Sequence, residues 1–182
     1  MSRREALKTT TVALGGVFAL SSGILDGCAG DGRPPLAGML SRRHQDLVED
    51  IADTLLPKTV ASPGARETGA GPAINLLLTD CYEAPVQQRL VAGLEEFRWH
   101  CQQRYQKEFG ELPRKEREDA LRVLGVDARK APETHWFPLM RELSLRSYFS
   151  SEAGMTKSLR YIQVPGKWVG CVPLTPGQPA WG

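Results

Sequence analysis

The chain has 182 residues, and its 23 Lys and Arg side chains stand against 21 Asp and Glu, which gives a net charge of +2 at pH 7. This length is sufficient for one domain with a buried core. The near balance of charge, without a long run of like charges, gives no electrostatic basis for binding nucleic acid.

Residues 1–27 are predicted to be an export signal. The adjacent Arg3 and Arg4 precede an uncharged, mildly apolar stretch from Thr9 to Leu25, and a basic start followed by an apolar segment is typical of such signals. The arginine pair is similar to the twin-arginine motif Ser-Arg-Arg-x-Phe-Leu-Lys, from which it departs at Ala6. The alternative is a chance basic pair in an ordinary signal or anchor. At about 17 residues, the apolar stretch is short for a permanent membrane span.

Cys28 is a candidate for lipidation. It follows Leu25-Asp26-Gly27, and a Leu three places before a Cys resembles the lipid-attachment box of bacterial lipoproteins, although Asp26 is unusual there. A lipid on Cys28 would hold the protein at a membrane surface without a spanning helix. The alternative is simple cleavage nearby, which would leave Cys28 in a leader or remove it.

Residues 28–40 are predicted to be a flexible leader, because they are rich in Gly, Pro and Asp. Residues 41–160 are predicted to form a helical domain. Its first helix is expected to begin at a Ser41 cap and to end at Pro57, since apolar residues recur between them at helical spacing. A loop should follow over 57–71, and Pro72 should then occupy the first position of a short buried helix that continues to Leu78.

The longest helix is expected to start at Pro85 and to stop at Gly110. A shorter amphipathic helix should cover 113–124 and end at Gly125, with Ala120, Leu121, Val123 and Leu124 facing inward. Residues 133–149 are apolar on almost all sides and predict a central core helix, which tolerates Pro138 only in its first turn. No segment alternates as a strand would. We therefore predict an all-α fold, a compact helical bundle.

Residues 161–182 predict a long irregular C-terminal tail. Pro165, Pro173, Pro176 and Pro179 exclude a helix, while the segment is too rich in Trp, Val, Ile and Leu for a solvated tail. Long irregular segments of compact domains are often functional. We expect this tail to pack on its own bundle or on a partner, because Trp and Tyr are favoured interface anchors. The aromatic candidates for a partner interface are Tyr148, Phe149, Tyr161, Trp168 and Trp181.

The residue types that serve in catalysis, cofactor binding or metal binding do not occur at the spacings that these functions require. His44, His100 and His135 are far apart and have no partner at metal-ligand spacing, so we interpret them as structural. The chain lacks Cys-x-x-Cys pairs, a phosphate-binding glycine loop and a nucleophile elbow. We therefore expect no catalytic residue, cofactor site or metal site in this chain.

Cys81, Cys101 and Cys171 are expected in an oxidising compartment if the chain is exported. Cys81 and Cys101 are poorly placed for each other, because a helix from Pro85 would carry Cys101 about 24 Å away from that residue. We therefore expect Cys171 to pair with one of the two, and we favour Cys81. Buried free thiols and a bond to a partner chain are the alternatives.

Several segments resemble the gluconate 2-dehydrogenase subunit 3 family. These are Leu143–Thr156, Leu159–Tyr161, Val164–Gly166, Gly170–Leu174 and Ala180–Trp181. The resemblance extends from about Leu47 to Trp181, and a twin-arginine start is typical of the family. Ile162-Gln163 departs slightly from the Asp-Pro often found there.

The resemblance implies a small, non-catalytic subunit of a periplasmic dehydrogenase complex at the outer face of the cytoplasmic membrane. The large partner would be similar to flavin-dependent glucose–methanol–choline oxidoreductases. It would hold FAD, oxidise a sugar or sugar acid, and pass electrons to a cytochrome c subunit. A folded-export signal on a chain without a cofactor site fits an escort that carries this flavoprotein through the twin-arginine translocase. The alternatives are a stand-alone periplasmic lipoprotein that binds a ligand or partner through its tail, and an enzyme in its own right.

Overall fold

A computed structural model describes residues 38–164, 166 and 169–181. In this part of the chain the regular structure is helical, and the only β-type pairing is an isolated bridge between Arg160 and Trp181. The all-α prediction is therefore confirmed. The helices are α2 (Arg42–Leu55), α3 (Ala70–Cys81), α4 (Ala84–Tyr105), the 3₁₀ helix η2 (Phe109–Glu111), α5 (Arg114–Ala128), α6 (Phe137–Phe149) and the π-helix η3 (Gly154–Ser158).

Two helix starts agree with the sequence signals. The Ser41 side chain accepts a hydrogen bond from the His44 amide at 3.3 Å and so caps α2, which satisfies one of the amides that have no partner inside the helix. Pro138 lies in the first turn of α6, where its missing N–H and fixed φ do no harm. These local signals set where two of the core helices begin.

Other helix boundaries differ from the prediction. α3 begins at Ala70, so Pro72 occupies its third position rather than its first, which is tolerated because the first four amides of a helix have no helical acceptor. α4 ends at Tyr105, before Gly110, because Gln106 takes the left-handed conformation with φ 56°. Gly110 lies instead in η2, where an added Cβ would come within 2.1 Å of an Asp50 carboxylate oxygen.

The prediction for α5 was wrong in two respects. The helix continues through Gly125 and ends at Ala128, because a single glycine weakens a helix by only about 1 kcal/mol and Ala128 is buried in the core. Val123 was expected to face inward, but it is 55 % exposed, whereas Leu121 is buried.

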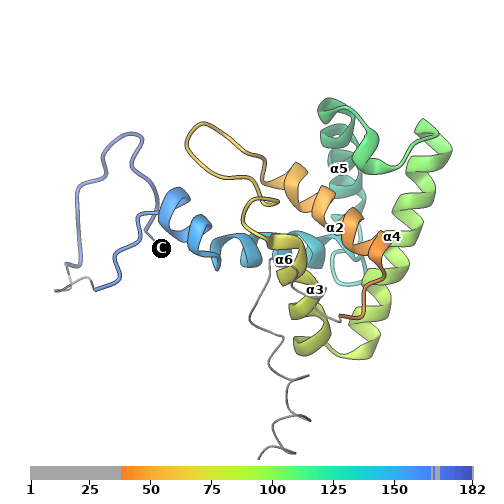
Figure 1. The fold of residues 1–182 in the computed structure, drawn as a ribbon, viewed down its shortest axis with the longest axis horizontal. Coiled ribbons are helices and arrows are strands. Elements are labelled where there is room, and N and C mark those ends of the chain that lie inside the picture. The colour runs from red at the N-terminus through yellow and green to blue at the C-terminus, as the bar shows by residue number, and fades with distance from the viewer. Residues whose placement is uncertain (1–37, 165, 167–168, 182) are drawn as a thin grey trace, which may run out of the picture. The chain divides into compact units, whose positions relative to one another are not determined.

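The core surrounds α6, which lies beside α2, α3, α4 and α5 (Figure 1). Its Met140 and Leu143 are fully buried, together with Ile51 of α2, Leu78 of α3 and Leu94 of α4. Each such side chain contributes roughly 1.5–3 kcal/mol by its removal from water. The central position predicted for this helix is confirmed.

Polar contacts fix the helices at specific points. A ring nitrogen of the buried His44 lies 2.7 Å from a Glu95 carboxylate oxygen and links α2 to α4. The Gln87 amide donates to the carbonyls of Leu78 and Tyr82, at 2.9 and 2.8 Å. Because the last carbonyls of a helix have no helical donor, Gln87 both ends α3 and joins it to α4.

Candidate partner-docking surface

The chain after η3 exposes most of its large apolar side chains. We define the C-terminal segment as residues 159–181, and in Figure 1 it lies clear of α4 and α5. Val164 is 79 % exposed and Leu174 is 84 % exposed. Half-exposed members are Tyr161, Ile162, Val169, Val172 and Trp181. Scattered exposed apolar residues are ordinary, whereas their concentration in one segment is typical of an interaction site.

The base of this segment is closed by a contact between its two ends. The Arg160 amide donates to the Ala180 carbonyl at 2.7 Å, and the Arg160 guanidinium lies 4.2 Å from the centre of the Trp181 ring. Such cation–π contacts contribute about 0.5–1 kcal/mol at exposed sites. The described part of the segment is thus a loop whose ends meet, and its exposed apolar residues lie between them.

Tyr148 supports the base of the segment from inside the domain. Its hydroxyl donates to the Pro63 carbonyl at 2.8 Å and lies 2.6 Å from the Ser158 hydroxyl. The side chain is only 3 % exposed, which corrects its assignment to a partner interface, because a buried ring offers no surface to another chain. Phe149 is half-buried and packs edge-on against Tyr148, with the two ring centres 4.9 Å apart.

The three cysteines of the described chain are free thiols. Cys81, at the end of α3, and Cys171 are both exposed, and the Cys81–Cys171 disulfide is not formed in this structure. Cys101 is buried in α4. Burial there, and secondarily the Glu108 carboxylate, raises the pKa of its thiol from 9.0 to about 11. Cys101 is therefore a protonated, apolar core residue at neutral pH, whereas the two exposed thiols are open to pairing.

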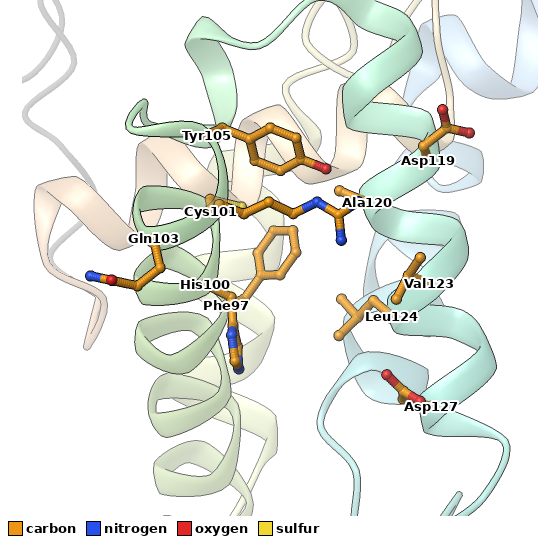
Figure 2. Close-up of a pocket in the computed structure, with 11 residues that line it drawn as sticks. Phe97, His100, Cys101, Gln103, Tyr105, Asp119, Ala120, Val123, Leu124 and Asp127 are labelled. Carbon is orange, nitrogen blue, oxygen red and sulfur yellow. The ribbon is translucent and has the colours of Figure 1, made fainter.

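A groove between α4 and α5 is a second feature of the surface (Figure 2). Its volume is about 470 Å³, within the range of small-molecule sites. Phe97 and Tyr105 point from α4 toward Ala120 and Leu124 of α5. The groove has no signal in the sequence: Val123, which lines it, was expected to face inward with Ala120 and Leu124, and only the structure shows this side chain exposed.

The chain was compared with known proteins. The sequence model of gluconate 2-dehydrogenase subunit 3 matches residues 42–166, which is more than two thirds of the chain. The chain belongs to the gluconate 2-dehydrogenase subunit 3 family. No curated protein and no solved structure matches it. Membership associates the chain with a dehydrogenase complex, as one of its subunits.

The match places the family signature on the helical domain. It covers α2 to η3 and ends at Gly166, so the resemblance noted between Leu143 and Gly166 lies inside it. Most of the C-terminal segment lies beyond it. For this member of the gluconate 2-dehydrogenase subunit 3 family, the exposed apolar residues at Val169, Val172 and Leu174 are therefore outside the matched range.

The histidines predicted to be structural have separate partners in the described chain. His44 contacts Glu95, His100 lies 3.7 Å from Glu96, and the His135 ring accepts the Phe137 amide at 3.1 Å. In the described residues, no three His, Cys, Asp or Glu side chains are grouped closely enough to hold a metal ion. Among the described helices, none has the length and apolar character needed to cross a bilayer.

Several predicted sites lie outside the described residues, namely Arg3, Arg4, Cys28 and Trp168. The export signal, the leader and the lipidation of Cys28 therefore stay predictions, as do the domain boundaries. Of the five aromatic interface candidates, the structure leaves Tyr161 and Trp181 about half exposed, at 45 % and 49 %.

Proposed function

We propose that this chain is the non-catalytic small subunit of a periplasmic, FAD-dependent dehydrogenase complex that oxidises a sugar or sugar acid. In this proposal it binds the large flavoprotein subunit through the C-terminal segment, stabilises it, and escorts it through twin-arginine export. Family membership supports the association with a dehydrogenase complex. The observation that carries the docking role is the exposure of Val164 and Leu174 on a loop with closed ends.

Removal of the exposed apolar side chains from water favours docking of the C-terminal segment. Each large apolar side chain left in water forgoes roughly 1.5–3 kcal/mol that burial would supply. The C-terminal segment holds too many prolines to form a helix that would bury its apolar side chains against α6. A partner surface that covers these side chains recovers that free energy. The Arg160–Trp181 contact lowers the cost of ordering the loop on binding, because its ends already meet.

The export role rests on the division of labour between the two chains. Twin-arginine export carries folded proteins, and a flavoprotein folds around its cofactor before transport. Arg3 and Arg4 supply the signal on this chain, while FAD belongs to the partner. A subunit that binds the loaded flavoprotein in the cytoplasm carries it to the periplasm, at the outer face of the cytoplasmic membrane. A cytochrome c subunit then accepts the electrons, and a lipid on Cys28 would add a membrane tether.

The experiment changes the signal and follows the flavoprotein. In cells that express both chains, Arg3→Lys with Arg4→Lys should leave dehydrogenase activity in the cytoplasm, because the translocase requires the arginine pair. The matched control is Arg42→Lys with Arg43→Lys, an exposed adjacent pair at the start of α2, which should leave export unchanged. Activity that still reaches the periplasm in the signal variant contradicts the escort role. A chain that purifies from the periplasm alone supports a stand-alone lipoprotein instead.

A further inference from the structure

The groove between α4 and α5 has an apolar floor and one aromatic side. Phe97 and the buried thiol of Cys101 come from α4, and Ala120 and Leu124 come from α5 (Figure 2). Tyr105 closes one side of it. The protonation of Cys101, whose pKa is about 11, leaves no charge on this floor. The floor therefore suits a flat apolar body, such as an aromatic ring.

One cation of the groove has no anionic partner. The Arg104 guanidinium lines the groove and lies 5.5 Å from the centre of the Tyr105 ring. Among the described residues, no carboxylate lies within ion-pair distance of it. Arginine presents its donors in a planar fork that matches a carboxylate with two parallel hydrogen bonds. The groove thus offers an unused carboxylate-binding group beside an apolar floor.

The acidic residues of the groove already have cationic partners. Asp119 lies 2.6 Å from Arg122, and Asp127 lies 2.7 Å from Lys130. The hydrogen bond from Lys130 lowers the pKa of Asp127, so this carboxylate stays ionised and paired at neutral pH. The other polar lining groups are the imidazole of His100, which lies 3.7 Å from Glu96, the amide of Gln103 and the hydroxyl of Tyr105. The charge left unmatched in the groove is positive.

We propose that this groove binds a small aromatic carboxylate. Its ring lies on Phe97, Ala120 and Leu124, and its carboxylate is held by Arg104. The volume of about 470 Å³ accommodates a molecule of this size. The site is independent of the docking role of the C-terminal segment, from which it lies apart in Figure 1.

The test uses a matched pair of probes, 1-naphthoate and its neutral analogue 1-naphthamide, titrated into the full chain by calorimetry. The acid should bind at least tenfold more tightly than the amide, because a charge-assisted pair with Arg104 is formed only by the acid. Arg104→Gln should remove this tenfold preference and leave amide binding unchanged. Arg141→Gln, at an exposed arginine of α6 outside the groove, is the matched control and should retain it.

A second variant locates the binding. Ala120→Phe places a ring in the groove itself and should abolish binding of both probes, while circular dichroism shows the fold retained. Thermal denaturation gives an independent readout, since a saturating ligand of the native state raises the melting temperature. Equal affinity for acid and amide overturns the proposal, and so does naphthoate binding that survives Ala120→Phe. A lack of naphthoate binding to the unaltered chain also overturns the proposal. The groove would then be a site for a partner helix and not for a small molecule.

Discussion

Gly93 of α4 is the point where a single added methyl group should damage the core. An ideal Cβ there would lie 2.1 Å from both Cδ1 and Cγ of the Trp136 indole. Trp136 is 5 % exposed and packs between Phe97 and Phe137, with ring centres 6.0 and 5.8 Å away. The indole must therefore move by about 1 Å or more to restore normal contact, and its neighbours leave it little room.

The expected change in the free energy of unfolding for Gly93→Ala follows from two opposing effects. Alanine in place of glycine inside a helix gains about 1 kcal/mol of helix propensity. Overpacking a core costs roughly 1–3 kcal/mol, and expulsion of a buried Trp costs about 3–5 kcal/mol. After the helix gain is subtracted, overpacking leaves a net loss of about 0–2 kcal/mol and expulsion of the indole a net loss of about 2–4 kcal/mol, so Gly93→Ala should lower the free energy of unfolding by an intermediate amount, about 1–3 kcal/mol. At roughly 2–4 °C per kcal/mol for a chain of this size, the melting temperature should fall by about 2–12 °C.

Gly125 of α5 is the matched control. It also lies inside a helix, but its added Cβ would make only an ordinary contact, at 3.6 Å from Phe137 Cε1. Gly125→Ala should therefore raise the free energy of unfolding by about 0.5–1 kcal/mol. Thermal and urea denaturation followed by circular dichroism measure both variants. A Gly93→Ala protein as stable as Gly125→Ala would refute the close packing of α4 against Trp136.

Two further predictions concern titration and thiols. The hydrogen bond from His44, and secondarily Arg98, lowers the pKa of Glu95 below its ordinary 4.5, so this contact stabilises the fold above pH 4.5 and is lost as pH falls through the lowered pKa. The stability difference between the unaltered chain and Glu95→Gln should shrink over that window in denaturant titrations, and a difference independent of pH contradicts the contact. Alkylation of the folded, reduced chain at neutral pH, read by peptide mass spectrometry, should modify Cys81 and Cys171 well before Cys101, because only the last is buried with a raised pKa. Without prior reduction, protection of both exposed thiols would support the predicted disulfide.

The helices were predictable because their signals are local. Ser41 caps α2, and Leu47, Val48 and Ile51 recur on the buried face behind it. Helix ends were less predictable, because tertiary packing overrides glycine signals. Gly110 is needed for the approach of Asp50, and it does not end α4. The end falls at Gln106, whose left-handed conformation no sequence rule assigns to glutamine.

The candidate site was predictable in outline only. Proline content and apolar residues identified the C-terminal segment as unusual, but its closure depends on Arg160 meeting Trp181, 21 positions later. Tyr148 was predicted to be an interface residue because it is aromatic. Its burial could not be foreseen, since its hydroxyl partner, the Pro63 carbonyl, lies 85 positions earlier in the chain. The groove could not be found from sequence, since it exists only through the spacing of α4 and α5.

The central claim is that the C-terminal segment binds a flavoprotein, and one co-purification measures it. The chain is isolated from cells that express it together with its genomic neighbours, as the unaltered protein, as Leu174→Glu and as the matched control Val126→Glu on α5. Leu174 and Val126 are exposed, at 84 % and 43 %. Neither change should therefore alter the free energy of unfolding by more than about 0.5 kcal/mol. We expect the unaltered chain and Val126→Glu to carry a flavin-containing dehydrogenase in equal amount and Leu174→Glu to lose it. Equal recovery of flavin with Leu174→Glu, or a lone colourless chain in every case, would contradict the account.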